Sequence, residues 1–561
     1  MATTAEETSQ LASGAAASGE DAAARTSHRL ALWNMWIGFA AFALALPMGL
    51  YQIAVRSGLF PAIQSDTIYA AAVSTHGVLM AYVLSTFFIM GFGYHTAYHT
   101  LRQRPWSPAF AWTGFWIATL GVVLAASALL TNRASVMYTF YPPEMADASF
   151  YFGVALFVVG SWFWCVNMIV EMVRWKKANP GRAVPLIMFG TAINALLWLW
   201  TSLGATLEVL FQLIPVSMGW IDTLDPGLAR TLFSWTLHAI VYFWLIPAYL
   251  VMYSILPKEA GGYLFSDEMA RIAFVMLFIF SVPIGFHHLY MDPQQAAGWK
   301  LLHMFGTFMV AVPTFITGFT VIASLELSGR LRGGKGLFGW IGKLKWNNPV
   351  VLAGILALLM LTFGGFGGVI NASYAMNAAV HNTGWVPAHF HLIYGGTTVI
   401  MYFAAAYWLW PKITGRKLWS TALSNIQLWM WFVGMWIVTA PWHVIGLMGQ
   451  PRRTSDQPYD SPIADSWVPY EVLMIFGAAL LVLSGLLFIV ILLETHRNRV
   501  SEPNPQPAYA TAVHQPLAVP KLLNSLAFWS WAMLAYMLIS YGYPILQFFF
   551  LGTPGSMEWG Y

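Results

Sequence analysis

Two histidines, His389 and His391, flank Phe390 inside a long apolar segment. On an α-helix, with about 100° of rotation per residue, positions two apart point to nearly opposite sides. One helix could therefore offer an imidazole to a different partner on each side. Ionisable residues at membrane depth indicate functional sites, and neutral imidazole is the commonest metal ligand. The sequence therefore predicts metal ligation, shared with four histidines of other apolar segments: His76, His238, His287 and His288.

The composition indicates which class of protein holds these histidines. Hydrophobic residues make up 58% of the 561 residues and charged residues only 9%, too little charge to cover a soluble domain of this size. Apolar runs long enough to cross a bilayer as helices recur along nearly the whole chain. We expect an all-α fold, a polytopic transmembrane bundle of about thirteen helices. The predicted spans are residues 31–55, 67–98, 108–130, 147–173, 186–217, 228–256, 269–290, 300–326, 348–372, 386–410, 424–447, 469–494 and 524–551.

The basic residues predict the orientation of the chain. With the N-terminus in the cytoplasm, all but six of the 27 lysines and arginines fall in predicted inner segments, as the positive-inside rule requires. The protein is therefore expected to be a multi-pass membrane protein with a cytoplasmic N-terminus. The net charge of +4 follows from these loops and needs no nucleic-acid partner. The six outer residues are Arg56, Arg133, Arg230, Lys300, Arg452 and Arg453.

The division into domains is simple. Residues 1–27 are rich in Ala, Ser, Thr and Glu and lack the apolar core of a signal peptide. They are predicted to form a disordered cytoplasmic extension. Residues 28–561 are expected to form one integral-membrane domain.

The sixth predicted span combines a histidine with tyrosines. His238 and Tyr242 are four residues apart, so their side chains meet on one helix face. Tyr249 and Tyr253 continue this stripe towards the predicted cytoplasmic end. Aromatic stripes in membrane helices usually serve packing, but this one ends on a histidine, which favours a functional role.

Two threonines of the eighth predicted span, Thr314 and Thr317, are expected at about the depth of these tyrosines. Hydroxyl groups and ordered water between the two helices could relay protons from the cytoplasm towards His238. The alternative is that each threonine hydroxyl bonds a carbonyl of its own helix, as is common in membranes.

The chain resembles the catalytic subunit I of haem–copper oxygen reductases, and specifically the B family of cytochrome c oxidases. The resemblance covers roughly residues 30–550. It rests on five motifs: residues 75–80, 137–143, 238–242, 287–288 and 381–391.

The resemblance implies a set of cofactors. His76 and His391 would be the axial ligands of a low-spin haem, because two imidazoles saturate an iron and suit it to electron transfer. His389 would hold a high-spin haem, expected to be of the a type, whose other face stays open for oxygen. A copper ion would be held by His238, His287 and His288, which leave it an open position. Tyr242 would be covalently joined to His238 and supply oxygen with a proton and an electron.

The resemblance also implies an anion-binding group at the outer side. Arg452 and Arg453 would bind haem propionates, since guanidinium groups suit carboxylates, and His381 would join them. The alternative is that the arginine pair merely anchors the outer interface. Asn377 stands where members of the B family often carry an aspartate near the propionates. Its role in proton exit is therefore open.

The implied function is that of a terminal respiratory oxidase in the cell membrane of a prokaryote. It would reduce oxygen to water, coupled to proton uptake and pumping. Cys165 is the single cysteine, which excludes an internal disulfide, an iron–sulfur cluster and a paired-cysteine metal site. Electrons would therefore enter through a subunit II with a dinuclear copper centre, fed by a cytochrome c or a cupredoxin.

Two other functions stay open. Ala239 stands where the family usually has proline after the first copper ligand, which leaves room for a nitric oxide reductase with a non-haem iron. A non-enzymatic transporter with structural histidines is the second alternative. His95 and His99 near the end of the second predicted span are expected to snorkel towards the membrane surface. His303 and His443 match no ligand motif and are expected to serve packing or to lie at a haem edge.

Overall fold

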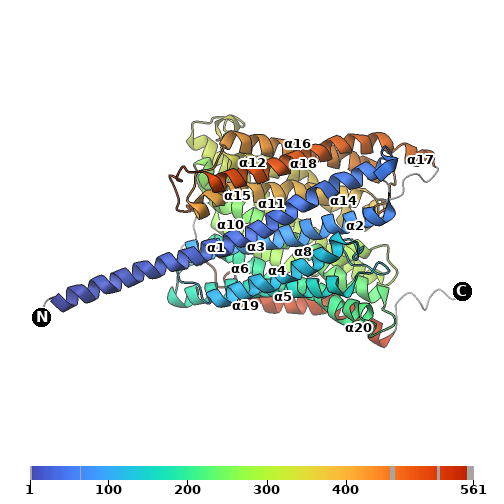
Figure 1. Cartoon of the computed structure of the whole chain (residues 1–561), viewed down its shortest axis with the longest axis horizontal. Coiled ribbons are helices and arrows are strands. Elements are labelled where there is room, and N and C mark those ends of the chain that lie inside the picture. The colour runs from blue at the N-terminus through green and yellow to red at the C-terminus, as the bar shows by residue number, and fades with distance from the viewer. Residues whose placement is uncertain (1–2, 64, 455–460, 515–518, 552–561) are drawn as a thin grey trace.

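The protein is a bundle of long helices that run side by side (Figure 1). The computed structural model describes residues 3–63, 65–454, 461–514 and 519–551, with side chains from residue 23. In this part of the chain, twelve helical segments are long and apolar enough to cross a membrane. They are α1 (Thr3–Arg56), α2 (Asp66–Gly77) with α3 (Ser85–Leu101), α4 (Pro108–Leu130), α5 (Ala148–Ala178), α6 (Leu186–Glu208) with α7 (Ile214–Ser217), α8 (Pro226–Ser254) with α9 (Leu256–Ala260), α11 (Ala297–Leu331), α12 (Pro349–Ala372), α14 (Trp385–His391) with α15 (Ile400–Thr414), α16 (Thr421–Leu447), α17 (Pro462–Asp465) with α18 (Val468–Arg497), and α19 (Leu526–Met537) with α20 (Tyr543–Phe550).

The predicted all-α membrane bundle is confirmed, and one of the thirteen predicted spans differs. Residues 269–290 were expected to form one continuous span, but α10 (Asp267–Ser281) has only 15 residues. At 1.5 Å per residue it is about 22 Å long, short of the roughly 30 Å of a bilayer core. Pro283 contributes to the early end, because proline has no backbone N–H to donate to the next helical hydrogen bond.

After α10 the chain continues as a short 3-10 helix, η4 (Gly285–Leu289), which contains His287 and His288. Gly285 packs directly on α8, where a Cβ atom would overlap the backbone carbonyl of Ser234. Glycine is therefore required at this point, since only a residue without Cβ allows such a close approach. This contact brings the histidine pair against the helix that carries His238.

Four spans contain a stretch of wider, π-helical turns: η2 (Val78–Leu84), η3 (Val209–Leu213), η6 (Leu392–Val399) and η7 (Leu538–Gly542). Two of these stretches directly follow a predicted haem ligand. His76 lies one residue before the end of α2, and His391 is the last residue of α14. Tyr394 of η6 joins the two stretches, because its hydroxyl donates to the Met80 carbonyl of η2 at 2.5 Å. Such π-helical turns inside α-helices are frequent at functional sites.

The spans that carry the predicted ligands lie at the centre of the bundle. In the most apolar stretch of each of the spans Asp66–Leu101, Pro226–Ala260 and Trp385–Thr414, 89% of the residues are buried, against 39% for α1, α4 and α11. The predicted ligands on these three spans are therefore held by protein on all sides, away from the lipid-facing surface.

The remaining elements connect the spans. They are η1 (Pro61–Ile63), η5 (Ile341–Lys343) and α13 (Tyr374–Val380). In addition, β1 (Leu264–Ser266) pairs in parallel with β2 (Ala512–His514). This two-stranded sheet ties the segment between α9 and α10 to the connector after α18.

The N-terminal segment differs from the expected irregular backbone. Helix α1 begins at Thr3, and Figure 1 shows this end of the helix projecting beyond the bundle. The assignment of residues 1–27 as a separate cytoplasmic extension and of residues 28–561 as one domain stays a prediction.

Candidate functional site

Helix α14 separates two cavities. His389 lines a cavity of about 350 Å³, called here the large cavity, and His391 lines one of about 200 Å³, called the small cavity. Phe390, between the two histidines, lines both cavities. The opposite projection of the two imidazoles, expected from the helix period, therefore sends them to two different cavities.

The small cavity holds the predicted low-spin pair. The rings of His76 and His391 are nearly parallel, at 11°, with 6.2 Å between their centroids. Bonds from imidazole nitrogen to metal are about 2 Å long, so the gap fits one metal ion between the two rings. The Nδ1 atom of His76 donates to the Ala45 carbonyl at 3.0 Å, and that of His391 to the Pro387 carbonyl at 2.7 Å. In both rings Nε2 is left free for a metal, a common arrangement of ligating histidines.

The large cavity brings together the three histidines predicted to hold copper. One ligand nitrogen each from His238, His287 and His288 lies within 4.8 Å of the others. The Nδ1 atom of His287 donates to the Ile284 carbonyl at 2.8 Å, which leaves its Nε2 for a metal. The Nε2 atom of His288 is buried and has no hydrogen-bond partner among the described residues. This set of three neutral nitrogen donors fits a copper ion.

His389 lines the same cavity as this histidine group. Helix α12 approaches its ring closely, because a Cβ atom on Gly367 would lie 2.8 Å from Nδ1, and one on Gly368 would lie 3.4 Å from Cε1. Glycines in this stretch of α12 leave space beside the imidazole. The cavity can therefore accommodate a flat group bound to His389 on one side with the three-histidine group on the other.

Tyr242 lies next to His238, as the helix spacing predicts. The tyrosine hydroxyl is 3.0 Å from His238 Nε2, and both residues line the large cavity. With Nε2 directed at the phenol, Nδ1 is the nitrogen of His238 that remains for a metal.

The tyrosine stripe and the two threonines also meet. The Tyr249 hydroxyl donates to Thr314 at 3.4 Å, and the Tyr253 hydroxyl donates to Thr317 at 2.7 Å. Thr317 in turn donates to the Pro313 carbonyl of its own helix at 2.7 Å. Both expected behaviours of this threonine thus occur together, because its hydroxyl bonds its own helix and still accepts from the tyrosine.

The residues predicted to bind propionates lie around the same end of the cavities. Arg452 lines both cavities, and Arg453 lines the small one. The guanidinium of Arg452 donates to Asn382 Oδ1 at 2.8 and 3.2 Å. His381 lines the large cavity, where its Nδ1 donates to Asn377 Oδ1 at 3.1 Å.

Burial, together with the positive charge of Arg452, lowers the pKa of His381 to about 4. A neutral His381 can donate one hydrogen bond and accept another. Its ring therefore adds no positive charge to the arginine group near neutral pH.

The geometry explains the amide at position 377. Asn377 Nδ2 donates to the carbonyls of Asn371, at 2.7 Å, and His287, at 3.2 Å. An ionised aspartate here would face both carbonyls with acceptors only. The asparagine therefore holds the backbone of a predicted copper ligand.

The chain is similar to proteins of one known family. Residues 29–480 match the family described as Cytochrome C and Quinol oxidase polypeptide I. Cytochrome c oxidase subunit 1 of Thermus thermophilus is 41% identical over 475 residues, which cover 82% of each protein. That of Thermostichus vulcanus is 25% identical, covering 83% of each. The cryo-EM structure of a heme-copper terminal oxidase dimer superposes with a TM-score of 0.88 at 34% identity, over 92% of each chain.

The chain belongs to the cytochrome c and quinol oxidase polypeptide I family. It is a multi-pass membrane protein with the fold of a haem–copper terminal oxidase. Haems and copper are the cofactors of this family, and the histidines of the two cavities fit them. Family membership favours an oxidase over the non-enzymatic transporter considered from the sequence.

Some residues of the oxidase site did not stand out in the sequence. Asp292 accepts from Arg230 at 2.8 Å, and its carbonyl accepts from Lys300 at 2.6 Å. Its carboxylate is also 4.0 Å from His381. These two basic residues were predicted to be outer ones, and their convergence on Asp292, one on its carboxylate and one on its backbone carbonyl, could not be read from the chain. Tyr394, which links the π-helical turns, also lacked a sequence signal.

His95 differs from the expectation of snorkelling, because only 1% of its surface is exposed. His303 does serve packing, as expected. Its ring stacks on Phe286 at 3.9 Å between centroids, and its Nδ1 accepts from the Phe286 backbone at 3.2 Å. His443 packs edge-on against Trp385.

Proposed function

We propose that the chain is the oxygen-reducing catalytic subunit of a B-family cytochrome c oxidase. The observation that carries the proposal is the meeting of three ligand nitrogens, within 4.8 Å of one another, with a phenol hydroxyl in the cavity lined by His389. A low-spin haem would be held by His76 and His391, a high-spin haem by His389, and copper by His238, His287 and His288. When bound, these groups supply electrons one at a time and an open metal position for oxygen.

The histidines act by presenting one chosen nitrogen each. Backbone carbonyls hold Nδ1 of His76, His391 and His287. Each of these rings is thereby locked in one tautomer and one orientation, and its Nε2 becomes a better ligand. The chain therefore prepares these ligand positions before any metal binds.

Tyr242 is proposed to donate a proton and an electron to oxygen. Its hydroxyl faces His238 Nε2 at 3.0 Å, which supports a covalent link between the two side chains and a direct path between the phenol and a copper ligand. The high-spin haem is proposed to be of the a type. Conversion of oxygen to water consumes protons, and the Tyr242 hydroxyl is a proton donor that lines this cavity.

Protons are proposed to reach Tyr242 along the tyrosine stripe. The Tyr253–Thr317 and Tyr249–Thr314 hydrogen bonds are two successive pairs between α8 and α11. Thr314 and Tyr242 both line the large cavity. Water between the pairs would complete the path, since a bridging water serves nearly as well as a direct bond.

Arg452, Arg453 and His381, together with Asn377, are proposed to bind haem propionates. Their position at the cavity linings supports this role. The cationic guanidinium groups would neutralise the carboxylates, while Asn377 acts through His381 and the His287 backbone.

The partners follow from what this chain lacks. With Cys165 as its single cysteine, it holds no pair for a dinuclear copper centre, so this centre is proposed to lie in a subunit II fed by a cytochrome c or a cupredoxin. The protein is proposed to work in the cell membrane of a prokaryote, with its N-terminus in the cytoplasm. Oxygen reduction would be coupled to proton pumping.

An optical spectrum and a metal count of the purified complex test the proposal. We expect two haem signals, one low-spin and one high-spin, and copper in this subunit together with oxygen consumption. Iron in place of copper, with turnover of nitric oxide, would instead indicate the nitric oxide reductase. A preparation of folded protein without haem bands would contradict both.

A further inference from the structure

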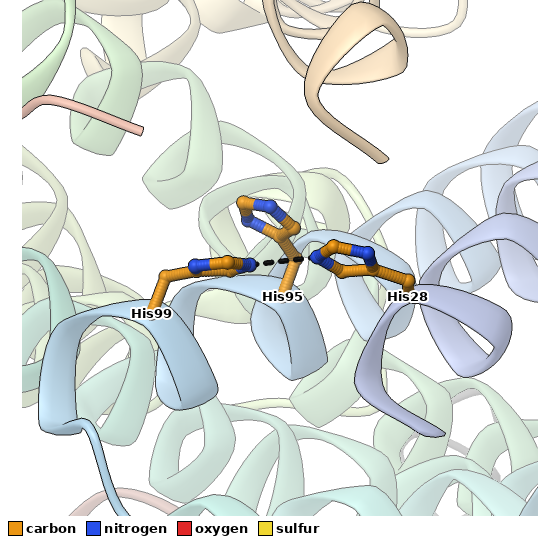
Figure 2. A group of neighbouring side chains, drawn as sticks. All are labelled: His28, His95 and His99. Carbon is orange, nitrogen blue, oxygen red and sulfur yellow. Dashed lines mark hydrogen bonds between the residues drawn. The ribbon is translucent and has the colours of Figure 1, made fainter. Parts of the chain in front are cut away.

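A second group of three histidines lies apart from both cavities. His28 comes from α1, and His95 and His99 come from α3. Figure 2 shows the three rings turned towards one another between these two helices. Each ring offers one nitrogen, and the three nitrogens lie within 4.8 Å of one another. Among the described residues, the only other group with this property is the predicted copper site.

Helix geometry explains how the group forms. His95 and His99 are four residues apart, so their rings lie over one another on the same face of α3, with 4.2 Å between centroids. Helix α1 packs along this face and adds the third ring. The His28 ring lies 5.1 Å from that of His99 and 5.6 Å from that of His95, at 21° and 17°.

The hydrogen-bonding pattern leaves a nitrogen free. His28 Nε2 and His99 Nε2 are 2.8 Å apart, so one of them donates to the other (Figure 2). His95 Nε2 is buried and has no partner among the residues that the structure describes. A buried polar atom without a partner costs free energy, and a metal ion would satisfy all three nitrogens at once.

We propose that His28, His95 and His99 form a binding site for a divalent transition-metal ion of the zinc class. Three neutral imidazoles leave such an ion a fourth position for water. His28 and His99 are only half-buried, so an ion can enter from the aqueous side of the bundle. Bound there, it fastens α1 to α3 near the end of α3 at Leu101.

The surrounding charge sets the expected strength of binding. Lys412 lies near enough to act on His95, and Arg102 near enough to act on His99. Repulsion from these cations weakens the binding of a dication. We therefore expect a site of moderate affinity, which fills and empties with the concentration of free metal.

Zinc titration of the complete oxidase complex tests the proposal. The complex, with its own haems and copper, is treated with a mild chelator and then titrated with zinc chloride. Bound zinc is measured by elemental analysis after desalting, and the melting temperature is recorded with and without zinc. We expect the wild-type complex to bind one equivalent that raises its melting temperature, since binding to the folded state alone stabilises it.

Two variants remove one ligand each. His28→Gln and His99→Gln keep a polar side chain but lose the imidazole, and each should weaken zinc binding by at least about 100-fold and abolish the melting shift. His514→Gln is the matched control, because His514 is exposed in β2 outside the group, and it should behave as wild type. Haem spectrum and copper content should stay unchanged throughout, which separates this site from the catalytic one.

Equal zinc binding in the wild type and both variants would overturn the proposal. So would a wild-type complex that binds no zinc, because the His28–His99 contact would then be only a hydrogen bond. Should a variant fail to assemble, zinc K-edge absorption of the wild-type complex counts the ligands directly. Three imidazole nitrogens support the site, and fewer overturn it.

Discussion

The two cavities beside α14 use the same kind of residue for different ends. In the small cavity, His76 and His391 face each other with nearly parallel rings, so both sides of a bound metal would be filled. In the large cavity, His389 lines an open volume that three histidines and a phenol also line. A metal with an imidazole on both sides is suited to electron transfer, whereas a metal with an imidazole on only one side has a position open to oxygen.

The backbone that holds the histidines also differs between the two cavities. Both ligands of the small cavity lie at the ends of regular helices that continue as π-helical turns, joined by Tyr394. Their positions are thus set by two spans that bond each other. The histidine pair of the large cavity lies instead on η4, a short turn after the broken helix α10, and is positioned by the approach of Gly285 to α8. The site proposed for oxygen chemistry thus lies where the regular helix ends.

The largest expected effect comes from removing either histidine of α14. His389→Ala should lower oxygen turnover by at least about 100-fold. It should also remove the high-spin signal while the low-spin haem is retained. His391→Ala should remove the low-spin signal instead, since it serves only the small cavity. Optical and magnetic spectra of both variants measure this. If both variants lose the same haem, the assignment of the two histidines to two different haems is wrong.

Tyr242→Phe should have the next largest effect, and only in the large cavity. The phenyl ring keeps the volume but loses the hydroxyl that lies 3.0 Å from His238. We expect both haems and most copper to remain, while turnover falls by about 10²–10⁴-fold, as for the loss of an acid–base group. Oxygen uptake alongside cofactor content measures the effect. Oxygen consumption near the wild-type rate would reject the proposed role of this phenol.

Thr317→Val should have a moderate effect on turnover. The substitution is nearly isosteric and removes the acceptor of the Tyr253 hydrogen bond. Turnover and proton uptake should slow by about 10-fold, the upper range for one hydrogen bond, whereas reduction of the low-spin haem by an external donor should start normally. Steady-state oxygen uptake and stopped-flow proton uptake measure this difference.

Thr320→Val is the matched control for this prediction. Thr320 lies on the same helix, is buried, and bonds its own Ile316 carbonyl at 2.8 Å, but no tyrosine among the described residues bonds it. It should keep wild-type rates. If the two valine variants slow proton uptake equally, the stripe is ordinary packing between α8 and α11.

Gly367→Ala should have the smallest effect. A Cβ atom there would lie 2.8 Å from His389 Nδ1, so the imidazole must shift. We expect altered high-spin spectra and a loss of turnover within about 10-fold, and overpacking of this kind should lower the stability of the fold by about 1–3 kcal/mol. The small cavity should be unaffected.

Leu359→Ala provides the comparison, because Leu359 is an exposed residue of the same helix that does not line the large cavity. Its spectra should match those of the wild type. A shift of equal size in both variants would mean that α12 responds as a whole, and that the close approach to His389 is not what matters.

The sequence by itself determined the class of the protein and its chemical groups. Composition and the length of apolar runs predict a membrane bundle because each span must satisfy its own backbone in lipid. The period of the α-helix directs His389 and His391 to opposite sides and brings His238 next to Tyr242. These predictions rest on local geometry, which the chain carries in its residue spacing.

Only the tertiary structure decided how separate spans meet. The end of α10 at Ser281, the contact of Gly285 with α8, and the convergence of Arg230 and Lys300 on Asp292 depend on neighbours far away in sequence. So does the meeting of His28 with His95 and His99, two histidines that the sequence assigned to snorkelling. Spacing along one helix predicts what that helix presents, but the packing of helices determines what each side chain meets.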